Sequence, residues 1–267
     1  MKATDYEHLR VREAVPHVVE VRIERAERRN SLTLSVLDEL SDALDTATAT
    51  GAHAVILTGA GPSFCAGADL YAVHNAELGH NNQVGLGRAR LWEQIGRLDI
   101  PVIAAVQGHA ITGGLHLAVC CDLIVAAEDA VFQDTHARFG LVPGSGEPQR
   151  LARRVGIAAA REILLTSRQF TAHEMHALGL VNRVVPASEL SAAALGLAQS
   201  IAGNNLRAVR YIKRMLNQGW GRPYGEAQWE DTVLNWGGRL NERADDDARE
   251  RLKAFRDRPR RPEEEQR

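Results

Sequence analysis

The stretch that decides the fold is Pro101-Val-Ile-Ala-Ala-Val-Gln-Gly-His-Ala-Ile-Thr-Gly-Gly114. Its first six residues form a short apolar run, which predicts a buried strand. The glycine pair at its end opens the apolar segment 115–121, a predicted helix, and residues 122–127 are largely apolar again. Strand, loop, helix and strand in this order are typical of an α/β protein with short crossovers.

The same alternation continues on both sides of this stretch. Apolar and polar side chains alternate over residues 17–24, and residues 54–58 form another apolar run, so both segments are predicted strands. Leucines recur every three or four residues within 31–48, which predicts a helix with one buried face. The polar, glycine-containing segment 79–87 is predicted to be a loop. Further helices are expected at 158–165, 172–178, 189–202, 205–218 and within 225–255.

The pattern predicts two regions, an α/β core over residues 1–200 and a helical region over residues 201–267. The tail from Arg256 is charged, broken by proline and poor in large apolar groups, so a frayed end is expected there.

Composition excludes several classes of function. The 267 residues carry a net charge of -2, so no basic field favours nucleic acid or a membrane surface. Three cysteines without metal-ligand spacing are expected to be free thiols. No apolar run approaches the roughly 20 residues of a membrane helix, and the N-terminus lacks a secretory signal. These features together predict a cytoplasmic protein.

Two glycine-rich loops can carry chemistry. One is Gly59-Ala-Gly-Pro-Ser-Phe-Cys-Ala-Gly-Ala-Asp-Leu70, and the other ends in the pair Gly113-Gly114 at a predicted helix start. Unpaired N–H groups at a helix start can hold an anion, and two such donors from separate loops would form an oxyanion hole. Glycine-rich turns at strand ends also serve purely structural roles, so each loop alone leaves both readings open.

Taken in order, the segments resemble the enoyl-CoA hydratase/isomerase (crotonase) superfamily over roughly residues 8–258. The motifs are Phe64-Cys-Ala-Gly-Ala-Asp-Leu70, Pro101-Val-Ile-Ala-Ala-Val-Gln-Gly-His-Ala110, Phe139-Gly-Leu-Val-Pro-Gly-Ser-Gly146 and Gly179-Leu-Val-Asn-Arg-Val-Val185. The resemblance implies a spiral of ββα repeats with a C-terminal helical trimerisation region. It also implies an acyl-CoA substrate, a homotrimer or hexamer, and no separate cofactor, because coenzyme A enters as part of the thioester.

The resemblance assigns site residues as well. The N–H groups of Ala68 and Gly113 would form the oxyanion hole. Phe255 would approach the nucleotide end of coenzyme A from a C-terminal helix. The remaining coenzyme A contacts would come from Arg28, Ala66, Ala68, Asp69 and Leu70.

The sequence departs from the family at its two catalytic glutamates, whose places are taken by His116 and His136. Imidazole, with a reference pKa of ~6.5, can accept or donate a proton near neutral pH, so the pair can still handle water. Asp134 and Glu147 are neighbouring carboxylates that could take over, although ordinary burial preferences favour exposed loop charges for both. No third metal ligand of suitable spacing is visible, so no metal is expected.

Three functions remain open at this point. The first is a reaction of the enoyl-CoA hydratase type, with His116 and His136 as the altered acid/base groups. The second is a different reaction of the superfamily, isomerisation, decarboxylation or thioester hydrolysis, in the same oxyanion hole. The third is an acyl-CoA binding protein that has lost the chemistry, since fold resemblance alone does not fix function.

Overall fold

The computed structural model describes residues 6–69, 78–233 and 246–257. Contacts divide the chain into two compact units, residues 1–204 and 205–267, and each unit is described by itself. Within the described ranges, no helix is long and apolar enough to cross a membrane.

The first unit is built on a six-stranded sheet with the order β1-β2-β3-β5-β7-β10. The outer pair β1/β2 is antiparallel, and the remaining neighbours are parallel. The predicted strands at 17–24, 54–58, 101–106 and 122–127 lie at β2, β3, β5 and β7, within one or two residues at each end. The strands are β1 (Leu9–Val15), β2 (Val18–Ile23), β3 (Ala54–Gly59), β5 (Val102–Val106), β7 (Leu123–Ala127) and β10 (Arg183–Val185).

A second, four-stranded sheet has the order β4-β6-β8-β9. Its strands are β4 (Ser63–Cys65), β6 (His109–Ile111), β8 (Val131–Gln133) and β9 (Phe170–Thr171). β3, β5 and β7 of the first sheet are each followed directly by one of these short strands, and β6 leads into the helix α4 (Gly113–Cys120). The chain therefore steps repeatedly from a long strand to a short strand to a helix, which is the predicted ββα repeat.

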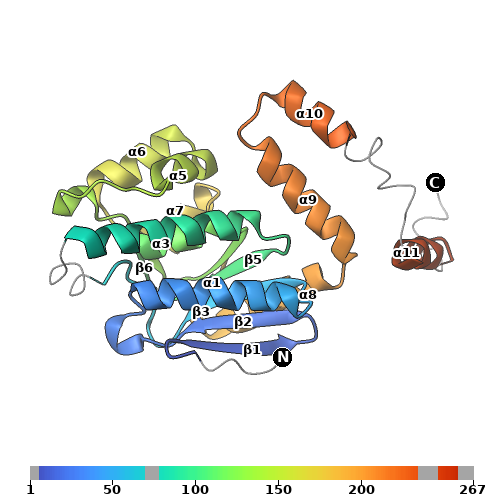
Figure 1. Cartoon of the computed structure of the whole chain (residues 1–267), viewed down its shortest axis with the longest axis horizontal. Helices are drawn as coiled ribbons and strands as arrows, with labels where there is room; N and C mark the ends of the chain where they lie inside the picture. Colours follow the sequence, from blue (N-terminus) through green and yellow to red (C-terminus); the bar gives the residue numbers. More distant parts are fainter. Residues whose placement is uncertain (1–5, 70–77, 234–245, 258–267) are drawn as a thin grey trace. The chain divides into compact units, whose positions relative to one another are not determined.

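Helices cover both sheets, and Figure 1 shows α1 (Leu34–Ala49) beside α3 (Leu78–Arg97). The side chain of Thr33 caps α1 by accepting from Val36 N at 3.3 Å. α8 (Leu190–Ala202) packs its apolar face against the first sheet. The first unit also contains α5 (Glu147–Val155), α6 (Ile157–Thr166) and α7 (Ala172–Ala177), with 3₁₀ turns η1 (Ala26–Arg28), η2 (Ala137–Phe139) and η3 (Ala187–Glu189).

The predicted loop at 79–87 is wrong, because these residues belong to α3. The glycines weaken the helical pattern in the sequence, yet α3 buries Leu91, Trp92 and Ile95 completely or nearly so. A Cβ added at Gly87 would lie 3.2 Å from Leu34 Cδ1, so this glycine lets α3 approach α1 closely. Tertiary packing thus outweighs the low helix propensity of the segment.

The second unit contains α9 (Leu206–Gly219), α10 (Tyr224–Thr232) and α11 (Asp246–Arg256). These helices agree with the ranges predicted as helical, 205–218 and 225–255, to within one residue beyond each range. The side chain of Asn205 caps α9 by accepting from Ala208 N at 2.9 Å. Large apolar side chains of this unit are exposed, among them Leu216 on α9, Trp220 directly after α9 and Trp229 on α10.

Candidate active site

The two glycine-rich loops of the sequence touch one another through their backbones. A Cβ added at Gly114 would lie only 1.9 Å from the carbonyl oxygen of Cys65, so no residue with a side chain fits there. Gly67 has φ +86°, a conformation that favours glycine, and a Cβ on it would lie 2.9 Å from Gly113 N. Leu32 fixes the loop at residues 66–69, because its N–H donates to Gly67 O at 2.7 Å.

This contact brings two backbone donors close together. A Cβ on Gly113 would lie 3.5 Å from Ala68 N, so the backbone nitrogen of Ala68 lies next to the first residue of α4. Within the described ranges, neither the Ala68 N–H nor the Gly113 N–H donates to another protein group. The dipole of α4 adds partial positive charge at Gly113. Together the two N–H groups can bind an oxygen that gains negative charge.

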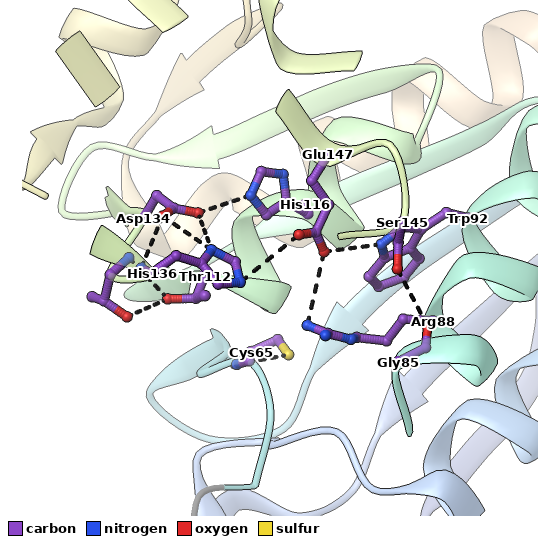
Figure 2. Close-up of polar contacts among 12 residues, drawn as sticks. Cys65, Gly85, Arg88, Trp92, Thr112, His116, Asp134, His136, Ser145 and Glu147 are labelled. Carbon is purple, nitrogen blue, oxygen red and sulfur yellow. Dashed lines mark hydrogen bonds and ion pairs between the residues drawn. The ribbon is translucent and has the colours of Figure 1, made fainter. Parts of the chain in front are cut away.

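Four polar side chains form a buried cluster next to α4 (Figure 2). His116 comes from α4, Asp134 and His136 follow β8, and Glu147 is the first residue of α5. Their exposed fractions are 1%, 0%, 5% and 1% respectively. The expectation that Asp134 and Glu147 are exposed loop charges is therefore wrong, and both carboxylates belong to the buried cluster.

Asp134 lies between the two histidines and contacts both of them. His116 Nε2 and His136 Nδ1 each lie 2.9 Å from Asp134 Oδ2, and the backbone N–H of His136 donates to Oδ1 at 3.0 Å. Burial by itself raises the pKa of Asp134, but the hydrogen bonds from His116 and His136 outweigh it and hold that pKa well below its ordinary value. Asp134 is therefore an ionised carboxylate over the whole physiological range.

Ionised Asp134 fixes the tautomers of both histidines. A carboxylate only accepts hydrogen bonds, so His116 Nε2 and His136 Nδ1 must both carry hydrogen. The lone pair of His136 then lies on Nε2, which faces Glu147 Oε2 at 3.8 Å. The lone pair of His116 lies on Nδ1, which is buried and finds no hydrogen-bond partner in the described part of the chain. His136 is consequently the ring whose free nitrogen faces another functional group.

Glu147 is held by two residues of α3. Trp92 Nε1 donates to Glu147 Oε1 at 3.3 Å, and Arg88 Nη1 lies 3.8 Å from the same oxygen. Figure 2 shows both side chains approaching Glu147 on the side away from Asp134. The other oxygen, Oε2, has no hydrogen-bond partner among the described residues.

Comparison with known proteins identifies the family. The model of the enoyl-CoA hydratase/isomerase family matches residues 13–263. The chain belongs to this family. It is 35% identical over 204 residues to a short-chain-enoyl-CoA hydratase of Clostridium acetobutylicum, covering 76% of this chain and 78% of the relative. It is 34% identical over 230 residues to a mevalonyl-coenzyme A hydratase of Aspergillus fumigatus, covering 84% of each.

Solved structures agree with the match. The crystal structure of an enoyl-CoA hydratase from Bacillus anthracis superposes with a TM-score of 0.89 at 34% identity, covering 94% of this chain and 96% of that one. The predicted α/β crotonase-like fold with C-terminal helices is thereby confirmed. This chain is accordingly an enzyme of the hydratase/isomerase family that acts on acyl-CoA thioesters.

Two of the residues predicted to bind coenzyme A, Ala66 and Asp69, are held by hydrogen bonds within the protein. Asp69 is buried, and its Oδ2 accepts from Ser31 Oγ at 3.0 Å and lies 3.3 Å from Arg25 Nη2. Its carboxylate therefore holds the loop together, and its backbone N–H donates to Leu32 O at 3.2 Å. Ala66 is held by its N–H, which donates to Arg29 O at 2.9 Å.

The three remaining residues predicted to contact coenzyme A are Arg28, Leu70 and Phe255. Arg28 is exposed in η1, on the surface of the first unit. Leu70 lies outside the described residues. Phe255 is exposed on α11, in the second unit, and its contribution stays a prediction.

A possible third metal ligand does exist, contrary to the expectation drawn from residue spacing. His116, His136 and Glu147 each offer a ligand atom, and these atoms lie within 4.8 Å of one another. Two imidazoles and a carboxylate would suit zinc or a similar cation. Arg88, however, already places a positive charge 3.8 Å from Glu147 Oε1 and opposes a dication there.

The cysteines are free and buried, as expected. Cys65 lies directly at the loop contact, and burial raises the pKa of its thiol to about 12. It therefore stays protonated at neutral pH and does not act as a nucleophile.

Proposed function

We propose that this enzyme adds water across the double bond of a 2-enoyl-CoA thioester. The observation that carries the proposal is the pair of neighbouring backbone donors, Ala68 N–H and Gly113 N–H, with no protein acceptor in the described ranges. Attack of water on the β-carbon moves negative charge onto the thioester oxygen. Two donors aimed at that oxygen stabilise the resulting enolate, and each is worth about 3 kcal/mol in such sites.

His136 is the base in this proposal. Its Nδ1–H is held by Asp134, so Nε2 presents a lone pair that can take a proton from water. Asp134 also stabilises the imidazolium that forms, as the carboxylate does in a Ser-His-Asp triad. His116 holds Asp134 from the other side, so both histidines serve the reaction, His136 in contact with water and His116 through the carboxylate.

The decisive experiment follows the enone absorbance of crotonyl-CoA. Wild-type enzyme is expected to remove it, and His136→Ala to lower kcat by about 10² to 10⁴-fold. His116→Ala is expected to have a smaller effect on kcat, because Asp134 keeps its bonds to His136. If wild-type protein at high concentration shows no turnover but binds acyl-CoA tightly, the protein is an acyl-CoA binding protein and the proposal fails.

Removal of metal is expected to leave this activity unchanged. The guanidinium of Arg88 already offsets the negative charge of Glu147, and both histidines bond Asp134, so the cluster is held together without a cation. The check is the hydration rate before and after dialysis against EDTA. A loss of activity that zinc restores would show instead that His116, His136 and Glu147 hold a required metal.

The assembly and the coenzyme A contacts complete the proposal. The exposed apolar side chains of the second unit, Leu216, Trp220 and Trp229, would be covered in the expected homotrimer or hexamer. The backbone of Ala66 and Asp69 would line the pantetheine channel, with Arg28 and Phe255 at the nucleotide. The cytoplasmic location and a role in fatty acid metabolism stay predictions.

A further inference from the structure

One buried group has no role in the proposed reaction so far. Glu147 is 1% exposed, its Oε1 is taken by Trp92, and its Oε2 has no hydrogen-bond partner within the residues described. A buried acceptor without a partner is costly, so it requires an explanation. His136 Nε2 lies 3.8 Å from Oε2. In the tautomer that Asp134 imposes, Nε2 carries a lone pair and is also an acceptor. Two facing acceptors call for a donor between them.

A water molecule fits that requirement. The separation of 3.8 Å is too long for a direct hydrogen bond, while one water can lie at hydrogen-bond distance from both atoms. Water supplies two O–H donors, one for each acceptor. We propose that Glu147 is a catalytic residue of this enzyme and, with His136, holds the water that is added to the substrate. This inference rests on the proposed hydration and assigns the reacting water its place.

The step balances with these groups alone. Water donates one O–H to His136 Nε2 and the other to Glu147 Oε2, and its oxygen forms a bond to the β-carbon. The proton shared with His136 moves onto Nε2. The C=C electron pair forms the Cα=C bond of the enolate, while the C=O pair moves onto the thioester oxygen at Ala68 and Gly113. When the enolate collapses, His136 returns this proton to the α-carbon. One water has then been added and both side chains are regenerated.

The environment of Glu147 suits this role. Trp92 and Arg88 both approach Oε1, so the carboxylate is turned with Oε2 toward His136. The first turn of α5 adds the positive end of a helix dipole, which favours the negative carboxylate. A catalytic carboxylate is thus supplied from the start of α5, although both of the family's glutamate positions are histidines.

The test is Glu147→Gln, which keeps the shape of the side chain and removes its charge. We expect kcat for crotonyl-CoA hydration to fall by about 10²-fold or more, with KM changed less than about threefold, because the lost interaction is with water and the transition state. Glu162→Gln is the matched control, since Glu162 is exposed and pairs with Arg168 on the surface. Its kcat is expected to equal that of wild type.

A second variant separates catalysis from structure. Glu147→Ala leaves space for a small carboxylate. Formate is therefore expected to raise the kcat of this variant about tenfold or more, whereas chloride is expected to leave it unchanged. A purely structural role would give no such rescue. If circular dichroism shows that the Glu147 variants are unfolded, the Trp92→Phe variant is tested in their place. It removes the donor that orients Glu147 and is expected to lower kcat about tenfold at constant KM.

The outcomes are distinguishable. Wild-type enzyme without hydratase activity refutes the proposed function itself. An active wild type with a Glu147→Gln variant that retains more than half of kcat overturns the role of Glu147 alone. Where the Glu147 variants do not fold, an unchanged kcat in Trp92→Phe likewise overturns the role of Glu147.

Discussion

Replacing Gly114 with alanine is expected to lower activity at least about 10²-fold and to destabilise the protein strongly. The added Cβ would lie 1.9 Å from Cys65 O and 2.7 Å from Cys65 C, and backbone cannot yield as a flexible side chain can. The loops carrying Ala68 and Gly113 must therefore separate. We expect kcat/KM to fall by at least about 10²-fold, the usual loss for one oxyanion-hole donor. Unfolding in urea should show a loss of about 3 kcal/mol, the upper range for overpacking.

Gly196→Ala is the control for this substitution. Gly196 lies within α8, and a Cβ there meets nothing within 4 Å. Alanine is expected to stabilise this helix by about 0.5 to 1 kcal/mol. Wild-type kcat/KM in Gly114→Ala would show that the close contact of the two loops is not needed for carbonyl binding.

Replacing Asp134 with asparagine is expected to lower kcat by about 10³ to 10⁴-fold, the loss seen when a catalytic histidine loses its orienting carboxylate. Asparagine has one acceptor oxygen, whereas Asp134 accepts from His116, from the His136 ring and from the His136 backbone. At least one imidazole must then change tautomer or lose its partner. The measurement is kcat for crotonyl-CoA, and a loss below tenfold would contradict the assigned role of Asp134.

Asp134 also predicts how stability depends on pH. Its pKa is lowered in the folded state, so the folded protein binds fewer protons there than the unfolded chain. The resulting stabilisation is complete above the unfolded pKa of ~3.9 and is lost as the pH falls from there toward the lower folded value. Urea unfolding at a series of pH values should show this loss in wild type and a flatter acid limb in Asp134→Asn. Equal slopes in both proteins would contradict the prediction.

The strands were predictable because local pattern decided them. The apolar runs at 54–58 and 101–106 can be satisfied only by burial on both faces, and they form β3 and β5 of the central sheet. The helix α3 was only partly predictable, since Gly79, Gly85 and Gly87 lower its helix propensity. Its existence depends on packing against α1, which lies about forty residues earlier and leaves no mark on the local pattern.

The sequence indicated the backbone loops of the candidate site better than its buried side chains, and the roles of these residues stay predictions. The glycine loops and the histidine positions follow from motifs, but the burial of Glu147 depends on Trp92 and Arg88, far away in sequence. A charged residue after a Pro-Gly loop is ordinarily exposed, so the local sequence favoured the wrong answer. In the sequence, the helical spacing of Trp92 with Leu91 and Ile95 was the sign of a buried helix face near the pocket.

In the proposed reaction the two carbonyl donors are backbone groups, which has an evolutionary consequence. The N–H groups of Ala68 and Gly113 belong to the main chain, so substitutions at His116, His136 or Glu147 leave the chemical identity of these donors unchanged. Under the proposed function, thioester activation is inherited with the fold, while the proton-handling groups can be exchanged one mutation at a time. A lineage can in this way pass from a pair of glutamates to a histidine and a relocated carboxylate, retaining a functional thioester pocket at every intermediate.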